Sequence, residues 1–129
     1  MGLQTIHEQT SIWMRRGHTL DEFETMVKKL RKRNISVVVH IINGLPNETE
    51  EMMLDTVRYL NQLDIQGIKI HMLHIIKDTI LAKEYEEHLF PLLSKDEYIS
   101  IVCRQLELLR EDIVIHGLTG DPDPIELIA

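Results

Sequence analysis

Four histidines, His40, His71, His74 and His116, lie at or near the ends of apolar segments. Three imidazoles that meet at one point would suit zinc or another transition metal, and would indicate a histidine-metal hydrolase. Alternatively, each ring fills a strand position and bonds a backbone carbonyl, which is the commoner role of a strand histidine. His71 and His74 are three residues apart and would project from opposite faces of a regular strand.

Two polar residues near the N-terminus are suited to hold a small ligand. Gln4 follows a short apolar segment, and Arg16 lies in the sequence RRGH that joins two predicted helices. A glutamine amide donates to and accepts from hydroxyl groups, whereas a guanidinium binds a carboxylate through two parallel hydrogen bonds. Taken alone, an arginine in this position is more often an ordinary surface arginine than a ligand-binding one.

A turn of composition NGLPN, residues 43–47, follows the longest β-branched segment and precedes three glutamates at positions 48, 50 and 51. Its glycine permits close approach of a ligand to the backbone, and its proline restricts the exit of the chain. One glycine and three carboxylates argue against phosphate binding. A neutral or cationic group, such as an adenine edge, would fit; as structure alone, the turn is an ordinary strand-to-helix loop.

The elements that must position these residues alternate between strand and helix periodicity. A strand buried on both faces is predicted over 36–42, a second buried strand over 67–76 and a short apolar strand over 113–116, and residues 2–4 resemble the end of another strand. Helices are predicted over 19–33, 47–63, 79–88 and from 94 onward, with capping pairs Thr19/Glu22, Asn47/Glu50 and Ser94/Glu97. Three of these helices have an apolar inner stripe. The stripe of 19–33 contains Phe23, Met26, Val27 and Leu30, that of 47–63 contains Met53, Val57 and Leu60, and that of the helix from 94 onward contains Tyr98, Ile101, Val102, Gln105 and Leu109.

This alternation predicts an α/β fold with parallel strands and right-handed crossovers. The length suits three to four strands, so we expect a partial parallel (β/α) barrel with helices on its outer face and without its N-terminal half. Residues 1–129 show no internal boundary. The sequence starts at the end of a strand and stops within an apolar tail, 125–129, so we expect a piece of a larger protein.

Composition narrows the function classes. The net charge of −7 gives no indication of nucleic-acid binding, which requires surplus Lys and Arg. No segment has the length of a membrane span, and the single cysteine excludes an internal disulfide, which favours a reducing, cytoplasmic location. An exposed sheet edge or apolar face at the expected truncation favours self-association into a homo-oligomer.

Four segments in order resemble the radical S-adenosylmethionine enzymes. They are GLQ followed by RGH, with Gln4 and Arg16 twelve residues apart, then HIINGLPNET (40–49), GIKIHMLHIIKDT (67–79) and VIHGLTGD (114–121). The resemblance covers essentially the whole chain. It is to the coproporphyrinogen-oxidase and elongator branch, and most of all to the YhcC-like subgroup.

The resemblance implies a function for the larger protein. Such enzymes hold a [4Fe–4S] cluster through CxxxCxxC and cleave S-adenosylmethionine reductively to remove a substrate hydrogen. It implies that Gln4 holds the ribose hydroxyls, that Arg16 holds the methionine carboxylate, and that Asn43, Gly44, Leu45, Met72 and His74 border the adenine. His40 stands where related branches commonly have an acidic residue that contacts the ribose.

The sequence lacks CxxxCxxC, and Cys103 falls in a predicted helix. We therefore expect this chain alone to be inactive and to bind no cofactor, with its missing N-terminal half as partner. A cluster-free nucleoside-binding α/β module and the histidine-metal hydrolase remain as alternatives. We expect no resident metal site and no catalytic residue within these 129 residues.

Overall fold

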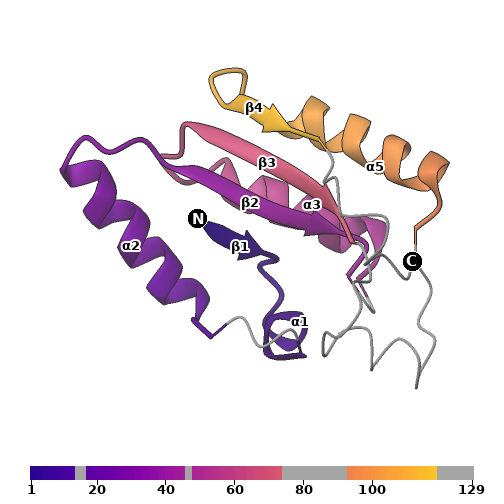
Figure 1. Ribbon diagram of the computed structural model, residues 1–129, viewed down its shortest axis with the longest axis horizontal. Coiled ribbons are helices and arrows are strands. Elements are labelled where there is room, and N and C mark those ends of the chain that lie inside the picture. The colour runs from indigo at the N-terminus through magenta and orange to yellow at the C-terminus, as the bar shows by residue number, and fades with distance from the viewer. Residues whose placement is uncertain (14–16, 46–47, 74–92, 119–129) are drawn as a thin grey trace, which may run out of the picture.

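The structure is a computed structural model and describes residues 1–13, 17–45, 48–73 and 93–118. Its four parallel strands form one sheet in the order β1-β2-β3-β4 (Figure 1). The strands are β1 (Gly2–Gln4), β2 (Val38–Asn43), β3 (Gly67–Met72) and β4 (Val114–Gly117). Strands β2 and β3 pair without interruption, whereas each outer pairing contains one register shift.

The described helices are α1 (Glu8–Trp13), α2 (Leu20–Lys32), α3 (Glu50–Leu60) and α5 (Lys95–Leu108). Parallel strands in sequential order, joined by right-handed crossovers, place their connecting helices on the same face of the sheet. In Figure 1 the sheet lies in front of α3. This arrangement confirms the predicted α/β fold and is that of a partial barrel. None of the helices in the described ranges is long and apolar enough to cross a membrane.

Helix starts follow the predicted capping chemistry in two of three cases. The side chains of Thr19 and Ser94 each accept from the backbone N–H three residues later, and Glu22 and Glu97 complete the two capping boxes. The start predicted at position 47 is wrong. The α3 helix begins at Glu50, because the hydroxyl of Thr49 accepts the Met52 N–H at 3.2 Å and makes threonine the N-cap.

Burial alternates along the central strands. Val39, Ile41, Ile68 and Ile70 are at most 1% exposed and belong to one hydrophobic cluster with the inner residues of the helices. The intervening residues of β2 are partly exposed. The prediction that these strands are buried on both faces is therefore wrong: the covering helices lie on one side. We call that side the helix face and the opposite side the open face.

The remaining predictions differ in detail. The inner stripe of α2 contains the buried Phe23 and Val27, but Met26 is 45% exposed and does not belong to it. The stripes predicted for α3 and α5 are buried as expected. Strand β2 is shifted toward Asn43, β3 ends at Met72, and β4 is shifted by one residue to Val114–Gly117. The predicted helix over 79–88 and the segment 120–129 lie outside the described residues.

Candidate functional site

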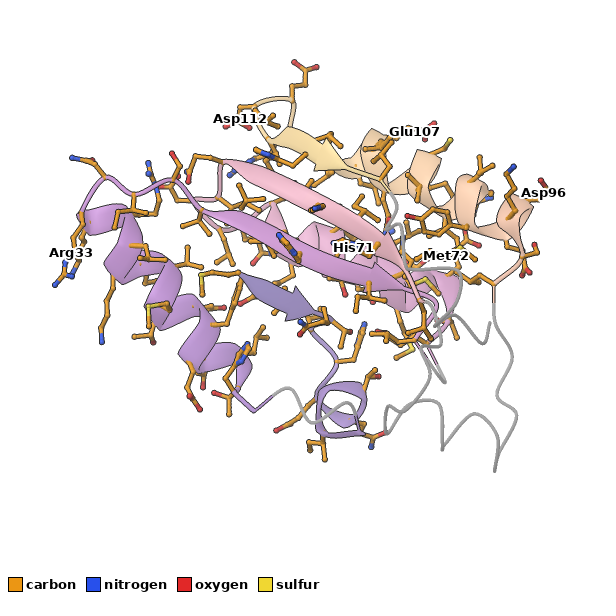
Figure 2. All side chains as sticks on the ribbon, viewed as in Figure 1. Arg33, His71, Met72, Asp96, Glu107 and Asp112 are labelled. Atoms are coloured by element: carbon orange, nitrogen blue, oxygen red, sulfur yellow. The ribbon has the colours of Figure 1, made fainter. Side chains whose placement is uncertain are left out.

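The carboxyl ends of the four strands meet at one edge of the sheet, where ligands bind in parallel α/β folds. Six of the eight candidate binding residues are described there or close by: Gln4, His40, Asn43, Gly44, Leu45 and Met72. Arg16 and His74 lie outside the described residues. Figure 2 shows His71 and Met72 toward the end to which β2 and β3 point.

Gln4 ends β1 in a left-handed backbone conformation, with φ of 61°, which is uncommon for a residue other than glycine. Its amide folds back over Gly2, where a Cβ would lie only 2.6 Å from the Gln4 Nε2 atom. Gly2 is the register partner of His40, so the amide lies on the open face. Its Oε1 atom is buried and has no hydrogen-bond partner among the described residues. This oxygen is therefore an acceptor suited to a ligand hydroxyl.

Asn43 lies at the end of β2, but its side chain is on the helix face. It donates from Nδ2 to Gln105 Oε1 at 2.8 Å and accepts from Gln105 Nε2 at 2.9 Å. Both residues are at most 1% exposed, and Gln105 Nε2 also reaches the Met53 carbonyl at 3.2 Å. The Asn43 side chain thus ties the strand end to α5, and only its backbone lies at the edge.

The turn after Asn43 is shaped by packing within the chain. Gly44 has φ of 93°, and a Cβ at this position would lie 3.1 Å from Leu93 Cδ1. Leu45 is 2% exposed. Met72, the last residue of β3 and the register partner of Asn43, packs against the hydrophobic cluster. The glycine is therefore required by its backbone angle and by Leu93, and Leu45 and Met72 are apolar side chains that pack within the chain beside this turn.

The open face brings three of the four histidines toward one another. The rings of His40 and His71 have centroids 5.4 Å apart and are tilted by 42°. A Cβ at Gly67, in β3, would lie 2.6 Å from His116 Nε2, so the His116 ring lies over that glycine. His40 is central in β2 and His71 and His116 are penultimate in their strands. Among the described residues no group of three His, Cys, Asp or Glu side chains is placed to hold a metal ion.

The pKa of His40 is lowered from its usual value. Burial is the largest cause, followed by the N-terminal ammonium and then by His71, Lys69 and His116. Lys69, which we did not identify from the sequence, is the register partner of His40. Lys69 could have been recognised from the sequence, because it lies two residues from His71 in the same strand and alternate strand residues share a face.

A second polar group was also missed. Glu48, just before α3, accepts a hydrogen bond from the Thr5 hydroxyl at 2.5 Å, while its Oε2 atom is buried without a partner among the described residues. Burial raises the pKa of Glu48, against the opposing effects of the Thr5 hydrogen bond and of His7. Thr5 is only 1% exposed. In the sequence Glu48 is indistinguishable from its acidic neighbours, and only the position of Thr5 after β1 hints at the contact.

Cysteine chemistry does not fit a cluster within these residues. Cys103 is the one cysteine of the sequence, and it is exposed on α5. An iron–sulfur cluster needs several thiolates. The described site therefore provides an amide, imidazoles, a carboxylate and apolar borders, which are groups that bind and orient a small polar molecule.

Comparisons with known proteins agree with this architecture. The chain is 46% identical to the protein YtqA of Bacillus subtilis over 128 residues, 99% of this chain and 39% of that protein. It is 28% identical to YhcC of Escherichia coli, over 100% of this chain and 42% of that protein. An archaeal Elp3 from Methanocaldococcus infernus has the same fold, with a TM-score of 0.90 at 17% identity over 98% of this chain and 30% of that one.

The chain thus spans about two fifths of the length of these curated relatives. Residues 1–60 match the radical SAM superfamily model, and residues 65–129 match the radical SAM C-terminal domain model. The two models follow each other in order, and the second alone covers half of the sequence. The resemblance found in the sequence is therefore confirmed, and the chain belongs to the radical SAM superfamily.

Proposed function

We propose that the protein is part of a radical S-adenosylmethionine enzyme and binds the nucleoside of S-adenosylmethionine at the carboxyl edge of its sheet. The observation that carries this proposal is Gln4. Its amide oxygen is buried without a partner among the described residues, at the end of β1 and in a strained backbone conformation. Strain and an unpaired acceptor at a strand end are typical of a ligand-binding position.

The roles of the other residues follow from their placement. Gln4 accepts from the ribose hydroxyls, and Arg16, by resemblance, binds the methionine carboxylate. Gly44, Leu45 and Met72 border the adenine through backbone and apolar groups. The Asn43 side chain takes no part, because it is engaged by Gln105. His40 lies on the same face as the Gln4 amide.

The cluster requires ligands from outside these 129 residues, since Cys103 is their one thiol. A reduced [4Fe–4S] cluster held there would supply the electron that cleaves S-adenosylmethionine and so makes hydrogen abstraction from a substrate possible. We propose that three cysteines in a CxxxCxxC segment, encoded upstream of Gly2, hold that cluster. In this division of labour the present chain binds and orients, and a preceding segment of the same protein completes the enzyme.

Calorimetric titration tests the assignment of Gln4 in the protein that carries the cluster segment. Gln4→Ala should weaken S-adenosylmethionine and 5′-deoxyadenosine alike, since both contain the ribose. Arg16→Ala should weaken S-adenosylmethionine roughly ten- to hundredfold, as expected for loss of a charge-assisted contact, and should leave 5′-deoxyadenosine unchanged. Gln62→Ala, in the exposed turn after α3, is the matched control and should change neither affinity.

The encoding gene offers the simplest check on the enzyme itself. A reading frame with CxxxCxxC ahead of Gly2 is expected. Its product, reconstituted anaerobically and supplied with S-adenosylmethionine and a one-electron reductant, should release 5′-deoxyadenosine. A gene without such a segment would overturn the proposed enzyme. Unchanged affinities in Gln4→Ala would overturn the role of Gln4 alone.

A further inference from the structure

The open face of the sheet carries four basic side chains, and three of them have no role in the proposed binding of the nucleoside at Gln4. Lys69 and His71 lie in β3, His40 in β2 and His116 in β4. We call these four residues the basic band, because together they cross three neighbouring strands.

The basic band is held together by pairing and by close packing over glycines. His40 is the register partner of Lys69, and its ring centroid lies 5.4 Å from that of His71. The His116 ring covers Gly67, where a Cβ would meet it at 2.6 Å. The Lys69 side chain lies alongside Gly117, where a Cβ would be 3.3 Å from Lys69 Cε. Each glycine therefore leaves the space that a basic side chain of the neighbouring strand occupies.

The charge of the basic band is of one sign. The four strands contain no aspartate or glutamate. Three basic side chains, His71, Lys69 and His116, contribute to lowering the pKa of His40. Glu48, an acidic side chain described near this edge, accepts from the hydroxyl of the buried Thr5. Like charges held this close raise the free energy of the site, and an anion lowers it by favouring the imidazolium forms.

We propose that the basic band binds an oxyanion, a carboxylate or phosphate group, of the substrate. Lys69 provides the permanent charge, and the imidazoles of His71, His116 and His40 provide N–H donors. The band lies on the same face as the Gln4 amide, opposite the helices, so the bound anion faces the same space as the nucleoside. The identity of the anion as substrate rests on the proposed function, whereas its binding does not.

Histidine NMR titration of the protein measures the binding directly. The Cε1–Hε1 signals are followed against pH without anion, with inorganic phosphate and with succinate at matched ionic strength. Occupancy should raise the apparent pKa of His40 and His71, because the anion stabilises imidazolium. His7 is the internal reference, since its Nε2 lies 2.8 Å from the Met52 carbonyl and outside the band. A response to phosphate alone, or to succinate alone, identifies which of the two oxyanions the site prefers.

Two variants locate the binding. Lys69→Gln should weaken the apparent phosphate or succinate affinity about tenfold, equivalent to about 1.4 kcal/mol. Lys29→Gln removes a lysine charge from α2, where the side chain is exposed, and should leave the affinity unchanged. His71→Gln serves as a second test in case Lys69→Gln alters the strand, and unchanged His7 and backbone spectra show that each variant is folded.

The outcomes separate the two proposals. If both anions leave His40 and His71 unshifted, or if Lys29→Gln weakens binding as much as Lys69→Gln, the basic band is not an anion site. That result would leave S-adenosylmethionine binding at Gln4 intact. Conversely, anion binding that persists in Gln4→Ala, in a protein whose gene encodes no CxxxCxxC, would support the site and overturn the enzyme.

Discussion

The two faces of the sheet are built from alternate residues of the same strands, yet different forces act on them. On the helix face, Val39, Ile41, Ile68 and Ile70 are at most 1% exposed and pack against three helices. On the open face, partly exposed polar side chains fold over glycines. Most of the buried packing therefore lies on the helix face, whereas the open face carries partly exposed polar groups. A residue's position in the alternation predicts whether its substitution mainly changes stability or the polar surface.

The largest effect on stability is expected when isoleucines on the two faces of the sheet are compared. Ile70→Ala removes a fully buried side chain from the helix face and should lower the free energy of unfolding by about 2–5 kcal/mol. Ile42→Ala, on the open face, should cost only about 1 kcal/mol. Urea unfolding of both variants measures the difference. Equal costs would show that the open face is as closely packed as the helix face.

The next effect concerns the buried amide pair. Asn43→Ala leaves the buried Gln105 Oε1 atom without the Asn43 donor and should cost about 1–3 kcal/mol of stability. Asn43→Leu together with Gln105→Leu removes both amides, so no polar group of the pair is left unsatisfied. The double variant should therefore lose less stability than the two single leucine variants lose in sum. A double-mutant cycle by chemical denaturation measures this coupling. A coupling of zero would mean that the pair does not tie β2 to α5.

A smaller effect depends on pH. Burial raises the pKa of Glu48, so the folded state favours its protonated form. This contribution to stability is present below the ordinary glutamate pKa and is lost as pH rises through the raised value. Glu48→Gln should therefore be more stable than the parent near neutral pH, by on the order of 1 kcal/mol, with the difference disappearing in acid. Thermal unfolding at several pH values measures it.

Glu97 provides a control, because its pKa is shifted in the opposite direction to that of Glu48. Hydrogen bonds from the backbone and side chain of Ser94 lower the pKa of Glu97, so its contribution is present above the ordinary glutamate pKa and is lost on acidification. Glu97→Gln should therefore be less stable than the parent near neutral pH and approach it in acid. If both variants changed stability in the same direction, the difference between the two environments would be disproved.

The smallest effect belongs to the open face. His40→Gln should change stability at neutral pH by no more than about 0.5 kcal/mol, because the ring is only partly buried. Its lowered pKa disfavours the charged form in the folded state, so the parent should lose more stability than the variant as pH falls through that pKa. Circular dichroism melts from pH 7.5 to 5 follow the two proteins. A larger loss in the variant would contradict the assigned sign.

Much of the fold was predictable because local interactions determine it. The capping pairs Thr19/Glu22 and Ser94/Glu97 lie within one helical turn, so their chemistry is visible in the sequence. The start of α3 was missed because Asn47 and Thr49 are both good N-caps, and choosing between them depends on how the loop leaves β2.

The site was less predictable than the fold. Gln4 was found at the strand end, whereas Thr5, Glu48 and Lys69 were missed. Asn43 was assigned to the ligand, yet its side chain bonds Gln105, which is 62 residues away. A contact of that separation leaves no periodic or short-range signal, because it depends on how α5 packs against β2.

Periodicity, caps and short motifs were enough to predict the succession of strands and helices, the parallel pairing and the family. The face on which each strand residue lies, and the partner that it meets, depend instead on how distant elements pack. A strand residue has two faces available, and its burial depends on where the helices cross the sheet. For this reason His40 and Asn43, three residues apart in β2, face opposite sides: the first joins the basic band, and the second is enclosed in the core.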